Sequence, residues 1–208
     1  MKNIFFALFI FTLISSCSEK KSTYEEEIKL FQYVLNVQFS DAEKSPLLEE
    51  DLKTFKGLDF FEINEKYKVE AEFELTPEAP IIEMQTNTER IPLFKKYGIA
   101  RFTIDGQPLE LSIYKEQNIG ASFEITDELF LPFNDATNGI STYGGGRYIE
   151  LGISEIRSKT IVIDFNRAYN PYCVYNEKFS CPIPPSENNL PIEIPVGIKA
   201  YKNIKDPV

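Results

Sequence analysis

The chain contains no histidine and no tryptophan among its 208 residues. Without histidine, the usual general base, the Ser-His-Asp and Cys-His relays and the commonest zinc sites are all excluded. Any catalysis would therefore have to use carboxylate, tyrosine or lysine side chains, or a metal ion. The absence of tryptophan leaves 17 phenylalanines and 11 tyrosines to build the core and any stacking surface.

Clusters of basic residues are also missing. The longest basic runs are the pairs Lys20-Lys21 and Lys95-Lys96, and the formal net charge is −10. Binding to nucleic acid draws on clustered lysine and arginine, so we expect no nucleic-acid partner. The share of hydrophobic residues, 43%, is that of an ordinary globular domain, and no repeat or composition change indicates a second one.

The N-terminal apolar run, Ile4 to Phe11, is too short to span a bilayer, for which a helix needs roughly 20 apolar residues. It follows Lys2 and precedes small residues, which is the layout of a secretory signal. Ile14-Ser15-Ser16-Cys17 resembles a bacterial lipobox, in which the cysteine is acylated and becomes the new N-terminus. We therefore expect a signal peptide over residues 1–16, and a lipidated Cys17 with a polar tether over residues 17–23.

These features predict a lipid-anchored protein of the cell envelope, held to the outer membrane and facing the periplasm or the cell surface. The membrane would then be its partner through the N-terminal lipid. The alternatives are an uncleaved anchor, or a plain signal peptide with a chance cysteine.

Two helices are predicted after the tether. Thr23 to Glu26 has the spacing of a capping box and precedes an apolar stripe. That stripe consists of Ile28, Phe31, Val34 and Leu35. Ser45-Pro46 predicts the start of a second helix, which should end at Gly57. Its buried side would carry Leu48, Leu52 and Phe55.

Further along the chain, the apolar period changes from helical to two, which is typical of strands. Asp105-Gly106 supplies the chemistry of a hairpin turn. The predicted strands are Tyr67–Leu75, Ile99–Ile104, Leu109–Tyr114, Tyr148–Ile153, Thr160–Phe165 and Ile192–Ile198. This pattern predicts a mainly β domain over residues 24–208, with one or two N-terminal helices and an antiparallel sandwich or open barrel.

The first group of unusual residues is Thr142-Tyr143-Gly144-Gly145-Gly146-Arg147-Tyr148. Three glycines before a strand let a backbone approach another group closely, and Arg147 can hold a carboxylate or phosphate with its planar fork. We therefore take Tyr143 and Arg147 as candidate ligand-binding residues. The alternative is a bulged turn in which Arg147 is paired with a structural carboxylate.

A second polar group follows the most apolar strand. Its donors and acceptors are Asp164, Asn166, Tyr169 and Asn170. Polar side chains at the end of a buried strand are well placed for recognition, so these four are also candidate ligand-binding residues. Asn170-Pro171 is equally a turn former, and a structural role carries similar weight.

Cys173 and Cys181 lie eight positions apart in a proline-rich segment. In an exported chain such a pair is a candidate disulfide that would staple the loop. Free thiols are a second interpretation. A metal or redox site is a third, although two thiolates without histidine fill only half of a zinc shell.

These residues give the chain a resemblance to the bacterial family known as domain of unknown function 1684, from about Leu30 to Lys199. The resemblance is carried by several motifs: Ser45-Pro46-Leu47, Phe55-Lys56-Gly57-Leu58, Phe130-Leu131-Pro132-Phe133, Thr142 to Tyr148, Asp164 to Pro171, and Cys181-Pro182 with Pro184-Pro185, Glu187-Asn188 and Leu190-Pro191. It implies that the segments Tyr143–Tyr148 and Asp164–Cys181 belong together, and it assigns no catalytic residue. The chain departs from the pattern at Gly197-Ile198-Lys199, where the family would have Gly-Glu-Lys.

The leading functional hypothesis is a binding module without catalysis, for a small polar molecule, a glycan or a peptide, with no cofactor implied. The six candidate residues supply stacking and adaptable hydrogen bonds for such ligands. A second hypothesis is a hydrolase without histidine, in which Asp164 or Asp135 works with Tyr143 or Lys199, with or without a divalent cation. A third is a purely structural envelope protein.

Overall fold

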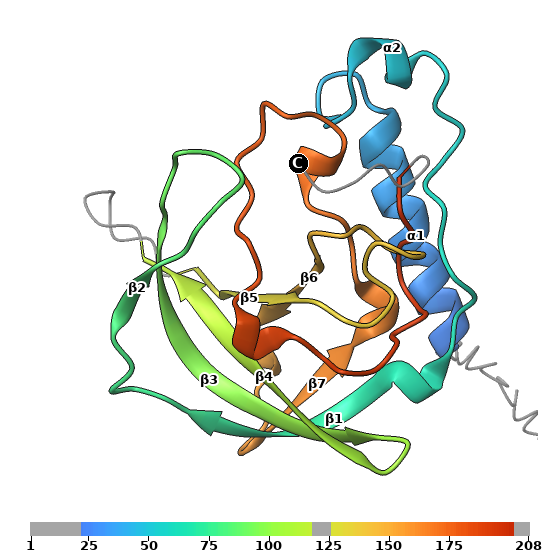
Figure 1. The fold of residues 1–208 in the computed structure, drawn as a ribbon. Coiled ribbons are helices and arrows are strands. Elements are labelled where there is room, and N and C mark those ends of the chain that lie inside the picture. The colour runs from blue at the N-terminus through green and yellow to red at the C-terminus, as the bar shows by residue number, and fades with distance from the viewer. Residues whose placement is uncertain (1–21, 118–125, 202–208) are drawn as a thin grey trace, which may run out of the picture.

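The computed structural model of the protein describes residues 22–117 and 126–201. Its main element is one antiparallel sheet that curls into a half-barrel, with helix α1 along one side (Figure 1). The strand order is β6-β5-β4-β3-β1-β7, and β2 pairs with β3. The strands are β1 Lys68–Leu75, β2 Ile81–Glu83, β3 Leu93–Ile104, β4 Gln107–Glu116, β5 Glu128–Phe133, β6 Arg147–Gly152 and β7 Thr160–Asp164. The prediction of a mainly β fold is confirmed, in its open-barrel form.

The helices are α1, Tyr24–Ser40, and α2, Glu49–Leu52. Short 3-10 turns complete the elements: η1 Glu65–Tyr67, η2 Ile153–Glu155, η3 Phe165–Arg167, η4 Tyr172–Val174 and η5 Ser186–Asn188. None of the helices in the described residues is both long enough and apolar enough to cross a bilayer. The signal peptide over residues 1–16 and the lipidation of Cys17 fall outside the described residues.

Helix α1 begins with the predicted capping box. The Thr23 side chain accepts a hydrogen bond from the Glu26 main chain, and the Glu26 carboxylate accepts one from the Thr23 N–H. The predicted apolar stripe needs one correction. Ile28 is buried, but the Val34 side chain is 55% exposed and points away from the barrel. The deeply buried positions of α1 are Ile28 and Phe39, eleven residues or about three turns apart.

The second helix is much shorter than predicted. It covers only Glu49–Leu52, because the Ser45 hydroxyl accepts a hydrogen bond from the Leu47 N–H and closes a turn there instead. Leu47 is consequently buried, whereas Leu48 is 40% exposed, the reverse of the predicted inward position of Leu48.

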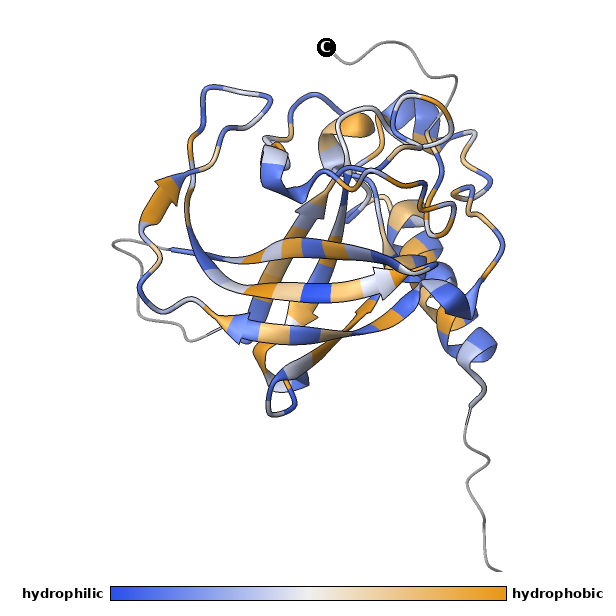
Figure 2. Ribbon diagram, turned by 60° about the horizontal axis from the view of Figure 1, so that its bottom comes forward, coloured by the Kyte–Doolittle hydropathy of each residue, from blue (hydrophilic) through white to orange (hydrophobic). Residues whose placement is uncertain are grey.

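Alternation of polar and apolar residues is visible along the strands of the sheet (Figure 2). In β1 every second side chain from Val69 to Phe73 is buried, and the acidic residues between them are exposed. β3 and β4 form the predicted hairpin, with positive φ angles of 50° at Asp105 and 77° at Gly106. Two positive φ angles in succession match the right-handed twist of the paired strands.

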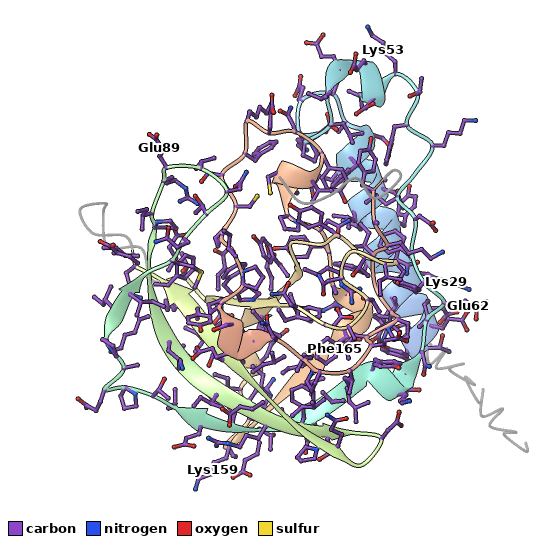
Figure 3. The ribbon with its side chains drawn as sticks, viewed as in Figure 1. Lys29, Lys53, Glu62, Glu89, Lys159 and Phe165 are labelled. Carbon is purple, nitrogen blue, oxygen red and sulfur yellow. The ribbon has the colours of Figure 1, made fainter. Side chains whose placement is uncertain are left out.

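The core fills the concave side of the half-barrel and holds residues from every strand except β2. Phe165, which follows β7, lies near its centre (Figure 3) and is fully buried. Its ring centroid is 5.8 Å from that of Phe102 and 5.2 Å from that of Phe133, which come from β3 and β5. These contacts join the residue after β7 to two interior strands of the sheet around a single apolar centre.

The predicted strand Ile192–Ile198 is not formed. The side chains of Ile194, Val196 and Ile198 are buried in strand-like alternation, but no neighbouring strand pairs with this segment as a ladder. Their carbonyl oxygens instead accept hydrogen bonds from the guanidinium group of Arg147. Two strands of the sheet are absent from the prediction: β2, which has only three residues, and β5, which contains a proline.

Candidate functional site

Arg147 is the largest fully buried side chain of the described residues. Its Nη2 atom lies 2.8 Å from Oδ2 of Asp135 and 2.8 Å from the Ile194 carbonyl oxygen. Its Nη1 atom lies 2.5 Å from the Val196 carbonyl oxygen. Burial lowers the pKa of Arg147, and the neighbouring carboxylate opposes this shift. Arg147 therefore fixes the extended segment 194–198 to the barrel and offers no surface to a ligand.

The turn before Arg147 is tightly enclosed. Gly146 has a φ angle of +91°, and a Cβ atom there would lie 2.6 Å from Cγ of Pro184 and 2.8 Å from the Phe133 carbonyl oxygen. Glycine is required on both grounds, because a side chain would be strained and would collide. The glycine-rich motif thus forms a tight turn, in line with its alternative interpretation, and Arg147 is paired with the buried carboxylate of Asp135.

Asp164 and Asn166 meet the helix and the chain before η1. The Tyr24 hydroxyl donates to both carboxylate oxygens of Asp164, at 2.9 and 3.1 Å. The Asn166 side chain donates to the Asn64 carbonyl and to Asp164, and accepts from the Asn64 N–H. Desolvation, strengthened by the charge of Asp164, raises the pKa of Tyr24 well above its usual range. The hydrogen-bonding groups of the Asn166 side chain are therefore already paired within the protein, whereas Asp164 also borders a cleft described below.

Asn170 is buried beside the C-terminal segment. Its Nδ2 atom donates to the Lys199 carbonyl at 2.9 Å and to the Tyr175 hydroxyl at 3.3 Å. The Lys199 ammonium pairs with Asp59, 3.2 Å away, on the surface. Asn170 therefore links the loop after η3 to the C-terminal segment and lies apart from Asp164 and Asn166, which contact α1 and η1.

Tyr143, Tyr169 and the two cysteines belong to another region, around Tyr148. The Tyr169 ring packs edge-on against Tyr148, and its hydroxyl donates to Glu150 at 2.8 Å. Tyr143 is half-buried, and burial raises its pKa, with smaller effects from both cysteines. The six candidate residues are therefore divided among separate contact networks and do not converge on one pocket.

Cys173 and Cys181 are in contact as free thiols. The Cys173 N–H lies 3.2 Å from Sγ of Cys181. A hydrogen bond from the Cys173 thiol lowers the pKa of Cys181 to about 7 and raises the pKa of Cys173. Cys181 is buried and Cys173 is half-buried, so the pair lies just below the surface.

The half-barrel is open between its two terminal strands, β6 and β7. A cleft of about 340 Å³, the seam cleft, lies between them next to the first turns of α1. It is lined by Glu27, Ile28, Lys68, Ile149, Glu150, Leu151, Glu155, Arg157, Val162, Asp164 and Arg167. Its walls combine apolar side chains with charged ones, which is the mixture typical of ligand sites.

The acidic and basic groups of the seam cleft have different kinds of partner. The carboxylates accept from neutral donors: Asp164 from Tyr24, Glu150 from Tyr169, and Glu155 from the Gly152 N–H. The cations contact aromatic rings instead. Lys68 lies over the Tyr24 ring at 4.5 Å, and Arg167 over the Phe31 ring at 5.4 Å. The positive groups therefore retain hydrogen-bond donors for an incoming acceptor.

Of the six residues predicted from the sequence, only Asp164 lines this cleft. Tyr169 does not line it but donates a hydrogen bond to Glu150, which does. Sequence reasoning missed Lys68, Arg157 and Arg167, because single charges among polar residues carry no local pattern. No local pattern shows that β6 and β7 end the sheet, because the order of the strands is set by the tertiary fold.

Sequence reasoning also missed a buried tyrosine bonded to a carboxylate. The Tyr114 hydroxyl donates to Glu187, whose Oε1 atom lies 2.9 Å from Nζ of Lys96. Desolvation and this bond raise the pKa of Tyr114 above its usual range. Lys96 and Glu187 border an apolar hollow of about 580 Å³, which also contains Ile82 and Ile99. Tyr114 itself does not line the hollow, so the group ties η5 to the sheet.

Comparison with known proteins gives a family and a fold relative. No curated protein matches the chain at a significant level. The solution NMR structure of an uncharacterized protein from Haloarcula marismortui is similar, with a TM-score of 0.66 and 30% sequence identity. The match covers 85% of this chain and 94% of that one. The family model described as protein of unknown function, DUF1684, matches residues 53–199. This chain therefore belongs to the DUF1684 family.

Proposed function

We propose that the protein is a membrane-anchored binding module of the cell envelope, and that it takes an extended peptide in the seam cleft. Anchorage is supported by the signal-like sequence that ends in Cys17. Peptide binding is supported by the two strand edges that face the cleft, which is the observation that carries the proposal.

At the outer edge of β7, Thr160 already exchanges two main-chain hydrogen bonds with Arg157, and the register with β1 leaves Val162 facing the seam. The Phe73 N–H donates to the Lys159 carbonyl, and Val69 lies opposite Ile163. Because main-chain groups alternate in direction along a strand, the N–H and C=O of Val162 point away from β1 toward the seam. Val162 is 41% exposed and lines the seam cleft.

The opposite edge belongs to β6. Tyr148 exchanges two main-chain hydrogen bonds with Tyr169 on the side away from β5. Two residues further, Glu150 directs its main chain to the same side, again by alternation. Glu150 and Val162 both line the seam cleft. An extended peptide between these edges would gain main-chain hydrogen bonds by strand addition, and Ile149 and Leu151 supply apolar contacts.

The proposal predicts that a β7 edge variant loses peptide binding. A library of unstructured hexapeptides would be screened by thermal denaturation, because a ligand at 100 times its Kd stabilises the folded state by about 2.7 kcal/mol. Val162→Pro removes the N–H that points into the seam without removing a hydrogen bond to β1. We expect this variant to bind the selected peptide at least about tenfold more weakly, one lost main-chain hydrogen bond being worth about 1.5 kcal/mol.

The matched control is Val162→Thr, which keeps both the branched shape and the N–H and should bind as the original chain does. Each variant's melting temperature without peptide shows whether it is folded. Undiminished peptide binding by folded Val162→Pro would contradict strand addition at this edge, and a library without any stabilising peptide would contradict peptide binding.

The alternative of a hydrolase without histidine has less support. Asp135 is bound to Arg147, and Lys199 is paired with Asp59. Asp164 accepts from Tyr24, whose raised pKa makes the tyrosine a poor proton donor. Within the described residues, neither carboxylate makes a hydrogen bond or ion pair with Tyr143 or Lys199, the partners that the hypothesis requires.

We also propose that Cys173 and Cys181 close a disulfide after export. The lowered pKa of Cys181 makes its thiolate, the attacking species, available near neutral pH. With oxidised glutathione, that thiolate forms a mixed disulfide and releases one glutathione, and the second cysteine then displaces the other. The protein should lose about 2 Da, two hydrogen atoms, at a rate that rises with pH through about 7.

The disulfide should stabilise the chain by about 2.5 kcal/mol on the loop-entropy model. Mass spectrometry and thermal denaturation measure the two effects. Cys173→Ser is the control, because it should stop at the mixed disulfide and retain bound glutathione. Persistence of both thiols in the original chain under these conditions would contradict the proposed disulfide.

A further inference from the structure

Helix α1 is apolar on two opposite sides. One side faces the protein and includes Ile28 and Phe39, each 1% exposed. The other side faces outward and consists of Leu30, Tyr33, Val34 and Val37, which are 61%, 65%, 55% and 49% exposed. We call these four residues the outward face of α1. Their spacing of three and four residues places them in one row along the helix.

The outward face is unusual for a helix at a protein surface. Such helices are normally apolar toward the core and polar toward water, and a helix that is apolar all round is normally covered on every side. In α1 the inward side alone is covered by described residues. Four neighbouring large apolar side chains, each about half exposed or more, form a patch of the kind that marks an interaction surface.

The short sequence distance from Cys17 to α1 supports a lipid surface as the cover of this patch. Cys17 precedes Tyr24, the first residue of α1, by seven residues, so at full extension they are at most about 25 Å apart. The helix itself, with 17 residues, is about 25 Å long. An acylated Cys17 would therefore keep the outward face within reach of the bilayer. We propose that this face lies on the lipid surface, an inference that rests on the proposed anchorage.

The charges of α1 specify the kind of lipid. Its first turn carries Glu25, Glu26 and Glu27, and Lys29 is already paired with Glu25 at 2.6 Å. Although Lys20 and Lys21 precede the helix, its first turn would be repelled by an anionic surface, so the charges of α1 fit a zwitterionic one. Tyr33 suits the headgroup level, because its ring is apolar and its hydroxyl is polar. Ile28, on the opposite side of the helix, continues to line the seam cleft, which docking leaves open.

The absence of tryptophan allows a direct test. In Tyr33→Trp, the introduced indole is the sole tryptophan of the full anchored chain. The chain would be reconstituted in phosphatidylcholine vesicles whose acyl chains carry bromine, a contact quencher of indole fluorescence. We expect quenching by about threefold relative to bromine-free vesicles, because an interfacial helix buries its apolar face at the headgroup and acyl boundary.

The matched control is Ile140→Trp. Ile140 is 74% exposed, lies in the turn between Thr137 and Thr142, and is not part of the outward face of α1. Its indole should be unquenched in the same vesicles. Equal quenching at positions 33 and 140, or none at position 33, would overturn docking of the outward face. Replacing part of the phosphatidylcholine by phosphatidylglycerol should weaken the quenching at position 33. Stronger quenching in the mixed vesicles would overturn the assignment of a zwitterionic surface.

Two further results distinguish the possible failures. Emission at position 33 that is shifted to the blue, depends on protein concentration and escapes bromine quenching would indicate a second copy of the chain and overturn lipid docking. Flotation of the original chain, but not of Cys17→Ala, tests the anchor separately. A chain that floats but shows no quenching at position 33 refutes docking alone, whereas a chain that does not float refutes the anchorage.

Discussion

Replacement of Arg147 by alanine is expected to lower the free energy of unfolding by about 4 kcal/mol, as measured by chemical denaturation. The substitution leaves the carboxylate of Asp135 buried without its charged partner. It also removes the donors for the carbonyl groups of Ile194, Val196 and Ile198, in a part of the chain that has no strand to replace them.

The control for this prediction is Arg101→Ala. Arg101 makes two ion pairs at similar distances, 2.6 Å to Glu74 and 2.8 Å to Glu110, but its side chain is 42% exposed. Because solvent screens exposed pairs, we expect a loss below about 1 kcal/mol. Similar losses of unfolding free energy in the two variants would contradict the view that burial makes the Arg147 network more stabilising than an exposed one.

A double variant separates charge from packing. Asp135→Leu combined with Arg147→Met removes both buried charges and fills most of their volume with apolar atoms. Such replacements of a buried pair are often neutral or better. Here the three carbonyl groups would stay without donors, so we expect recovery of only part of the stability lost in Arg147→Ala.

The sequence predicted the regular part of the fold well, because alternation and capping are local. The capping box at Thr23, the alternating strand β1 and the hairpin turn at Asp105-Gly106 all depend on residues within a few positions of one another. The segment 192–198 has the same alternation but is not a strand, because its partner is the Arg147 side chain. A sequence pattern reports which side chains are buried and does not report what pairs with the main chain.

The candidate site was harder to predict for a related reason. The polar residues that stand out in the sequence, such as Arg147, Asn166 and Asn170, mostly hold irregular main chain in place. The stretch from residue 153 to residue 201, the end of the described chain, includes only one strand, β7. Buried loops of this kind need side chains to satisfy their main-chain groups. The conspicuous polar motifs therefore contain residues that stabilise the fold. The seam cleft depends on the curl of the sheet, which no local motif predicts.

Asn188→Ala should have the second large effect on stability, a loss of about 3 kcal/mol or more in the free energy of unfolding. The Asn188 side chain accepts from the Ser112 N–H at 2.8 Å and donates to the carbonyls of Ser112 and Pro132 at 2.8 and 2.7 Å. β4 and β5 are paired only at Tyr114 and Phe130, so at Ser112 the amide takes the place of a neighbouring strand. Its removal leaves three buried main-chain groups without partners.

The adjacent residue provides the control. Asn189 also makes a side-chain hydrogen bond, with Asn134 at 2.8 Å, but it is exposed, so Asn189→Ala should cost less than about 1 kcal/mol. Hydrogen exchange gives a local readout, because the Ser112 amide should lose protection in Asn188→Ala and keep it in Asn189→Ala. Retained protection of Ser112 in Asn188→Ala would mean that β5 closes onto β4 when the amide is removed, and that the split between these strands is not set by Asn188.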